Sequence, residues 1–231
     1  MATARGSLPD VLDLIEDVYG PPAAPAVTDP WEQVLLENVA YLAGDERRLG
    51  AFERLRERIG TSPAALLASP LGDLRDVCGA GIRADAQARK LRAAARLASA
   101  SRGGDLSALG SMPLVGARRA LRRFPAIGEP GADRILLQAG LFAVPALDSN
   151  GLRVLVRLGL AVEAPGYEAT HRSGVAALRA GLPAEPAPLL RAYLLLRAHG
   201  RGLCRRTAPA CAACPLASRC AHAASLMMGR C

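Results

Sequence analysis

The chain has 231 residues, 51% of them apolar, so it can bury a sizeable core without disulfide bonds. It has no run of 18 uninterrupted apolar residues, and its N-terminal segment lacks the pattern of a secretory signal, which predicts a cytoplasmic protein. The formal net charge of +8 argues against an acidic protein and favours a polyanionic partner, although a merely solvated basic surface remains an alternative.

Apolar residues recur at helical spacing along most of the chain, whereas strand-like alternation is rare. This pattern predicts an all-α fold of short helices joined by Gly/Pro turns. The proline-rich stretch 20–30 predicts a linker between an N-terminal helix and the first helix of a core domain. In chain order, the expected helical segments are 11–19, 31–42, 49–59, 86–98, 132–142, 151–160 and 187–200.

Two parts of the chain are strongly basic. Arg118, Arg119, Arg122 and Arg123 form a run in the middle of the chain. After Glu185 no acidic residue occurs, whereas seven arginines do: Arg191, Arg197, Arg201, Arg205, Arg206, Arg219 and Arg230. These runs make nucleic acid the first candidate partner, with Arg118, Arg122, Arg205 and Arg206 as candidate phosphate contacts.

Four of the six cysteines lie close together, with the spacing Cys204-x6-Cys211-x2-Cys214-x5-Cys220. Short gaps that contain Gly, Pro and Ala let the backbone bring four thiolates to one point, as an iron–sulfur cluster or a structural zinc ion requires. Disulfide bonds are the weaker alternative in a cytoplasmic protein. Cys78 is expected to be a buried neutral thiol, and nothing in the sequence assigns a role to Cys231.

The stretch HGRGLC (199–204), followed by the three later cysteines, resembles the closing motif of the endonuclease III group. This group belongs to the helix-hairpin-helix (HhH-GPD) DNA glycosylase superfamily. The stretch FPAIG (124–128) is similar to the superfamily's hairpin Leu-Pro-Gly-Val-Gly, and Asp148 follows Gly128 by the same 20 residues. The resemblance implies a [4Fe–4S] cluster on the four cysteines.

The resemblance also implies roles for the hairpin and for the aspartate. Ile127, Gly128 and Gly131 would bring backbone N–H groups to DNA phosphates. Asp148 would stabilise positive charge on a deoxyribose ring, and it also has the features of an N-cap for the helix that follows. The superfamily usually has Asp-Thr-His where this chain has Asp148-Ser149-Asn150, so Asn150 is a candidate for the base pocket.

The resemblance bears on the reaction as well. Endonuclease III forms a Schiff base through a lysine two residues after the hairpin's last glycine, and this chain has Pro130 there. A proline nitrogen within a peptide bond cannot be a nucleophile, so we expect a monofunctional glycosylase without an efficient lyase step. Two alternatives remain: a bifunctional glycosylase/lyase that uses Lys90 or the N-terminal amine, and a non-catalytic DNA-binding or redox-sensing module.

The segment around residue 37 resembles the adenine glycosylases, in which a Pro-x6-Glu pattern carries a catalytic glutamate. Pro30 and Glu37 have this spacing, so Glu37 is a candidate acid that protonates the departing base. The alternative is a boundary glutamate paired with an arginine. Tyr41 and Leu42 are candidates for filling the gap that an extruded base leaves in the duplex.

These expectations together describe a two-lobed HhH-GPD fold. A six-helix core domain would span 31–140 with its hairpin near 124–131. A second domain of 1–30 and 141–231 would carry the cluster loop 204–220. The expected partner is double-stranded DNA with a damaged or mismatched base, and the expected form is a monomer in the cytoplasm, associated with the bacterial nucleoid. The sequence does not predict which base is removed.

Overall fold

The computed structural model describes residues 6–100 and 105–228. Cys231 and the N-terminal amine lie outside these residues. Within them the structure is helical, and the one isolated β-bridge pairs Tyr41 with Ile82. The expected all-α class is therefore confirmed. No helix in the described part of the chain has the length and apolar character needed to cross a membrane.

The chain forms two compact units, residues 1–24 with 143–231 (unit 1) and residues 25–142 (unit 2). They overlap the two domains expected from the sequence, and the assignment of 31–140 as an independent domain stays a prediction.

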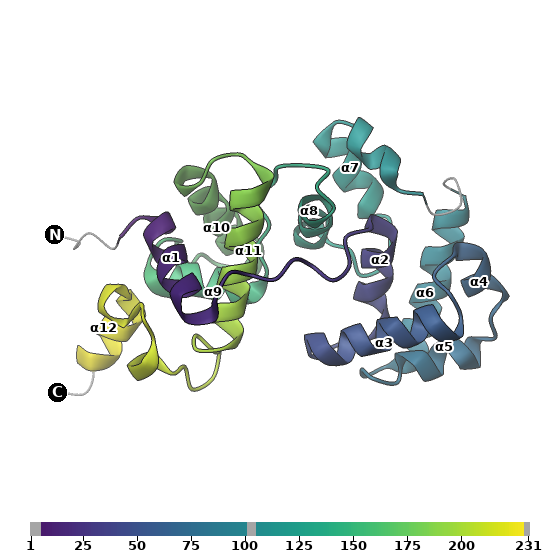
Figure 1. The fold of residues 1–231 in the computed structure, drawn as a ribbon, viewed down its shortest axis with the longest axis horizontal. Coiled ribbons are helices and arrows are strands. Elements are labelled where there is room, and N and C mark those ends of the chain that lie inside the picture. The colour runs from purple at the N-terminus through teal and green to yellow at the C-terminus, as the bar shows by residue number, and fades with distance from the viewer. Residues whose placement is uncertain (1–5, 101–104, 229–231) are drawn as a thin grey trace. The chain divides into compact units, whose positions relative to one another are not determined.

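Unit 1 is built around α9, which packs against α10, α11 and α12 (Figure 1). The N-terminal helix α1 lies against α10 and α11, far from it in sequence. Arg191 of α11 reinforces this contact, because its guanidinium donates to Asp13 at 2.8 Å and also pairs with Glu16. The helices of unit 1 are α1 (Leu8–Tyr19), α9 (Ser149–Leu158), α10 (Tyr167–Gly181), α11 (Pro186–Arg201), the short η3 (Cys211–Ala213) and η4 (Ala217–Arg219), and α12 (Ala221–Met228).

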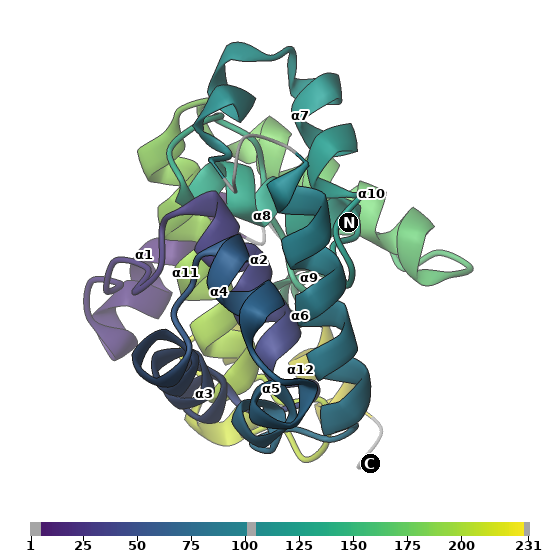
Figure 2. The same cartoon turned by 90° about the vertical axis from the view of Figure 1, so that its right-hand side faces the viewer.

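Unit 2 is built around α6, which packs against α2, α4 and α5 (Figure 2). Trp31 and Phe124 join α2 to the end of α7 with ring centroids 6.0 Å apart. The helices of this unit are α2 (Pro30–Val39), α3 (Asp45–Arg58), α4 (Pro63–Ala68), α5 (Leu71–Cys78), α6 (Ala84–Ser99), the short η2 (Ser107–Ser111), α7 (Leu114–Leu121) and α8 (Glu129–Gln138).

Each expected helical segment overlaps a helix, but one boundary differs in a way that matters for the site. The apolar pattern of the first core helix continues to Leu42, whereas α2 ends at Val39. Ala40 is extended, Tyr41 forms the bridge to Ile82, and Leu42 has a left-handed φ of 55°. The apolar residues beyond Val39 therefore do not extend the helix: Ala40 is buried, whereas Tyr41 and Leu42 lie in a loop with exposed side chains.

The hairpin between α7 and α8 contains a backbone conformation that its sequence does not favour. Ala126 has a φ of 63° at the position where the superfamily's hairpin has glycine. An L-residue costs about 1–2 kcal/mol in this left-handed conformation, so the surroundings must hold it there. Asn38 contributes, because its buried side-chain amide donates to the carbonyl of Pro125 at 2.9 Å.

Candidate active site and cysteine loop

The Asp148 carboxylate is the most completely hydrogen-bonded of the candidate catalytic groups. Asp148 is the N-cap of α9, and its Oδ1 accepts the backbone N–H groups of Asn150 at 2.9 Å and Gly151 at 2.8 Å. Its Oδ2 accepts the side-chain amide of Asn150 at 3.1 Å and Nε of Arg197 at 3.0 Å. The expected N-cap is therefore confirmed, and both oxygens are fixed in an arrangement that suits an ionised carboxylate.

A line of hydrogen bonds runs from Asp148 to the first cysteine of the loop. The Asn150 side chain, which donates to Asp148, accepts from Nη2 of Arg153 at 3.1 Å. The same guanidinium donates to the carbonyl oxygens of Cys204 at 2.9 Å and Gly200 at 2.5 Å. Burial lowers the pKa of Arg153, and the nearby thiol of Cys204 acts in the opposite direction.

Close packing of α9 and α11 makes this line possible, and it depends on a glycine. A Cβ on Gly200 would lie 2.6 Å from the carbonyl oxygen of Asn150, too close for any side chain. Tyr167, at the start of α10, is also near the aspartate: burial and the charge of Asp148 both raise the pKa of its phenol.

All four clustered cysteines line one small cavity of about 20 Å³ in unit 1. Cys204, Cys214 and Cys220 also pack against the hydrophobic core of the unit. Burial raises the pKa of the Cys214 thiol, and the charges of the other three thiols raise it further. The sequence-predicted ligands are thus brought together at one place.

Other side chains contact these sulfur atoms directly. Nη1 of Arg157 lies 3.5 Å from Sγ of Cys204, and Nε2 of His199 lies 3.6 Å from Sγ of Cys214. Burial lowers the pKa of His199 to about 4, so the imidazole is neutral at pH 7. Within residues 6–100 and 105–228, no three Cys, His, Asp or Glu side chains converge as ligands of one metal ion.

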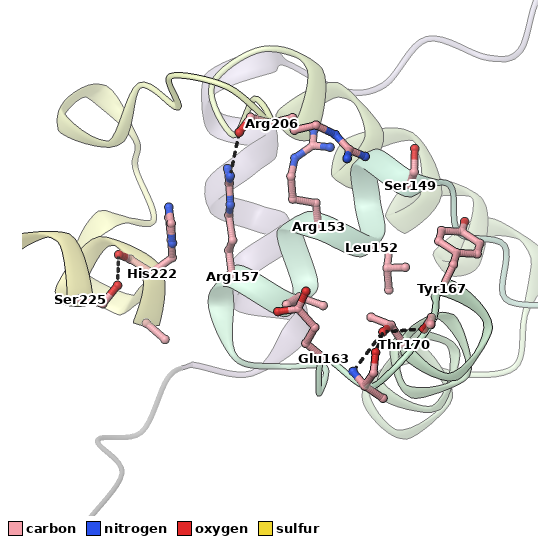
Figure 3. A pocket seen from close by; sticks show the side chains of 14 residues that line it. Ser149, Leu152, Arg153, Arg157, Glu163, Tyr167, Thr170, Arg206, His222 and Ser225 are labelled. Carbon is pink, nitrogen blue, oxygen red and sulfur yellow. Dashed lines mark hydrogen bonds between the residues drawn. The ribbon is translucent and has the colours of Figure 1, made fainter.

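An open pocket of about 790 Å³ lies beside the cysteine loop in unit 1 (Figure 3). In the close-up, Arg157 and His222 line one side, and Tyr167 and Thr170 line the other. Basic groups outnumber the single carboxylate, Glu163, in its lining. The full lining is Ser149, Leu152, Arg153, Val156, Arg157, Glu163, Ala164, Gly166, Tyr167, Thr170, Arg206, Ala221, His222 and Ser225.

In unit 2, the Glu37 carboxylate forms ion pairs with two arginines. Its Oε1 accepts from Nη1 of Arg134 at 2.7 Å and from Nη1 of Arg48 at 3.2 Å. The Glu37 side chain is 21% exposed. Two guanidinium groups stabilise the ionised carboxylate, whereas an acid that protonates a departing base needs the neutral form. The arginine-paired alternative therefore describes this geometry better, and the acid role of Glu37 stays a prediction.

The hairpin residues differ in what they offer to a DNA strand. Gly128 is exposed at the N-terminus of α8, which has no side-chain cap, and a Cβ there or at Gly131 would meet its neighbours at an ordinary 3.8 Å. The fold itself therefore does not require glycine at either position. Ile127 is buried in unit 2.

Of the predicted phosphate contacts in this unit, one is already engaged. Nε and Nη2 of Arg118 donate to Oδ1 and Oδ2 of Asp133 at 2.5 and 2.9 Å. Arg122, by contrast, is exposed.

Tyr41 and Leu42 lie on an exposed apolar surface of unit 2, and the bridge adds Ile82 to it. Leu42 and Ile82 are 72% and 53% exposed, which is unusual for such side chains. The sequence alone did not identify Ile82, because Ile82 lies next to Tyr41 only through a bridge between segments that are distant in the chain. The Nζ of Lys90 lies 5.8 Å from the centre of the Tyr41 ring.

No protein-family model matches the chain, and no curated protein matches it. Solved structures do match. An endonuclease III trapped as a covalent intermediate with DNA gives a TM-score of 0.77 at 18% identity, covering 96% of this chain and 99% of that one. A thermostable thymine-DNA glycosylase gives 0.74 at 15% identity, with 94% and 97% covered. The 3-methyladenine DNA glycosylase of H. pylori, bound to 1,N6-ethenoadenine, gives 0.62 at 16% identity, with 85% and 95% covered. The chain therefore has the fold of endonuclease III.

Proposed function

We propose that this protein is a DNA glycosylase that hydrolyses the bond between a damaged or mismatched base and its deoxyribose. The observation that carries the proposal is the Asp148 carboxylate, held by four hydrogen bonds at the N-terminus of α9. The superfamily resemblance gives an aspartate at this position the role of stabilising the sugar. The fold shared with solved DNA glycosylases supports the same function.

In this mechanism the target nucleotide leaves the base stack before the chemistry begins. As the N-glycosidic bond lengthens, its electron pair moves to the base, and positive charge develops on the deoxyribose. The ionised Asp148 stabilises that charge. A water molecule attacks C1′, and the proton that it loses as the C1′–O bond forms passes through solvent to the departed base, which took the electron pair of the broken bond. The products are the free base and an abasic site.

The role of Glu37 is a separate part of the proposal and has its own test. A residue that transfers a proton in the transition state contributes about 10²–10⁴-fold to the rate. A loss of that size in Glu37→Gln would assign it to the chemistry. Because Glu37 is paired with Arg48 and Arg134, a purely structural role predicts loss of stability instead, with little change in rate.

DNA would bind through backbone groups at the start of α8 and through exposed arginines. The uncapped N-terminus of α8 offers N–H groups and a helix dipole to a phosphate. Arg122 of unit 2, and Arg205 and Arg206 of unit 1, would neutralise further phosphates. The logarithm of the DNA-binding constant falls linearly with the logarithm of the salt concentration, and each lost phosphate contact should make this negative slope less steep by about 0.9. We expect this change for Arg122→Ala and Arg206→Ala, and a smaller one for Arg118→Ala.

The exposed Tyr41, Leu42 and Ile82 are suited to fill the gap left by the extruded base. Apolar side chains of this kind unstack base steps when a protein inserts them into a duplex. The left-handed backbone at Leu42 is the type of local strain that often accompanies function. Replacing Leu42 by Ala should therefore weaken excision from duplex DNA more than excision from a single strand.

We further propose that Cys204, Cys211, Cys214 and Cys220 hold a [4Fe–4S] cluster. The four thiols line one cavity with no carboxylate among its lining residues, and the donor set suits iron–sulfur chemistry. The cluster would hold the loop that carries Arg205 and Arg206. Its presence would give a brown protein with charge-transfer absorption in the visible range.

The absence of a lysine at Pro130 supports a monofunctional reaction. The second candidate is a bifunctional enzyme that uses Lys90, whose Nζ lies 5.8 Å from the centre of the Tyr41 ring, beside the residues proposed to enter the duplex. A contact with an aromatic ring stabilises the ammonium, whereas the nucleophile of a Schiff base is the neutral amine. Trapping with borohydride on damaged DNA separates the two, because only a Schiff base is reduced to a stable covalent complex.

The decisive experiment incubates the protein with duplexes that carry uracil, mismatched adenine, 8-oxoguanine, hypoxanthine, alkylated purines or oxidised pyrimidines. Strand breaks that need hot alkali, and that disappear in Asp148→Asn, are the expected result. Breaks without alkali would point to the lyase. Tight DNA binding without excision of any base would refute the proposal and favour the non-catalytic module.

A further inference from the structure

The two oxygens of the Asp148 carboxylate are held in different ways. Oδ1 is bonded by two backbone N–H groups, so its contacts belong to the N-cap of α9. Oδ2 is bonded by two side chains, Asn150 from the first turn of α9 and Arg197 from α11, 49 residues away. The behaviour of Oδ2 therefore depends on side chains that can be replaced without removing the helix cap.

Arg197 brings a full positive charge to this oxygen. Its Nε lies 3.0 Å from Oδ2, and the two side chains are only 27% and 25% exposed, so solvent screens the pair incompletely. The Asn150 amide is neutral. The Arg153 guanidinium contacts the side-chain oxygen of Asn150 and reaches the aspartate only through it. Hydrogen bonds in which donor or acceptor is ionised are roughly twice as strong as neutral ones, and of the two side chains at Oδ2 it is Arg197 that adds a charged donor to the charged acceptor.

We propose that Arg197 is a positioning residue, whose guanidinium keeps the Asp148 carboxylate in one orientation while the glycosidic bond breaks. This inference rests on the proposed glycosylase function. Without Arg197, Oδ2 would keep one neutral donor, and the carboxylate could turn away from the sugar. The expected loss in the excision step is about 10- to 100-fold, as expected for a charge-assisted hydrogen bond to a reacting group.

The first arm of the test measures single-turnover excision and duplex binding separately. Arg197→Met should lose 10- to 100-fold in the excision rate constant, with the dissociation constant for the same duplex changed by less than about threefold. Arg197→Lys keeps the charge and should recover most of that rate. Arg191→Met is the matched control, because Arg191 lies on the same helix and forms ion pairs with Asp13 and Glu16 instead. It should lose stability but keep its rate.

The second arm needs no activity. In protein labelled with ¹⁵N-arginine, the Nε–H resonance of Arg197 should move in Asp148→Asn and stay in place in the control variant Asp13→Asn. An unmoved resonance would show that the ion pair does not form in solution and would overturn the proposal.

The outcomes of the two arms separate this inference from the function on which it rests. If the Arg197 resonance moves in Asp148→Asn but Arg197→Met excises the base at the wild-type rate, the ion pair is only a structural contact and the proposal is overturned. A faster rate in Arg197→Met would mean that the arginine restrains the aspartate, which also contradicts the proposal. A wild-type protein that excises nothing would overturn the function, whatever the resonance does.

Discussion

Removing the carboxylate of Asp133 should destabilise unit 2 strongly. Asp133 is 4% exposed and binds the Arg118 guanidinium through two hydrogen bonds, which also raise the pKa of Arg118. Breaking a fully buried ion pair by removing one partner costs about 3–5 kcal/mol, because the other charge stays buried and unpaired. The Arg118 side chain is 20% exposed, so solvent offsets part of this cost. We expect Asp133→Ala to lower the free energy of unfolding by about 2–4 kcal/mol.

The only tryptophan of the chain makes this measurement specific to unit 2. Trp31 is buried there against Phe124, so its fluorescence during urea unfolding reports the unit that contains the ion pair. The double variant Arg118→Met with Asp133→Leu removes both charges and should recover most of the loss. A decrease below about 1 kcal/mol in Asp133→Ala, or a double variant no more stable than the single one, would refute the reasoning.

Three further predictions concern other parts of the chain. Ala126→Gly should raise the free energy of unfolding by about 1 kcal/mol, because glycine adopts the left-handed φ of 63° without strain; an unchanged urea midpoint would contradict this. Burial raises the pKa of the Cys78 thiol to about 12, so iodoacetamide at pH 8 should leave this thiol unmodified until the protein unfolds. Because the thiol ionises more readily in the unfolded chain, the free energy of unfolding should fall as the pH rises from 9 towards 12. Rapid alkylation of the folded protein would argue against burial. Gly200→Ala should separate α9 from α11 and displace Asp148, so excision should fall together with thermal stability; a stable and active variant would show that the backbone of Asn150 can yield.

Local patterns in the sequence were sufficient to predict the helical class and part of the site. Apolar spacing predicted α9, and the Asp148 N-cap follows from residue type and position alone. The helices α4, α5, α7 and α12 were missed because stretches of six to eight residues carry too few turns for a period to emerge. The helix α10 was missed although it has 15 residues.

Contacts between distant segments were beyond the reach of sequence patterns. Arg197 was predicted only as part of a basic run, and its pairing with Asp148 arises from the packing of α11 on α9. Arg118 was expected to bind phosphate as a member of a basic run. The sequence did not indicate that Asp133, 15 positions later, is buried and binds it. In both cases the arginine's partner depends on tertiary packing, which a single sequence does not reveal.

The arrangement of unit 1 along the chain has a consequence for folding during synthesis. The helix α1 is translated before its partner α11, which follows about 175 residues later. At about 5–20 residues per second, this interval is roughly 9–35 s, and unit 2 is completed within it. Until α10 and α11 are translated, near the end of that interval, the apolar face of α1, with Val11, Leu12 and Ile15, lacks the helices against which it packs. This face is therefore the part of the nascent chain where we expect a chaperone to bind.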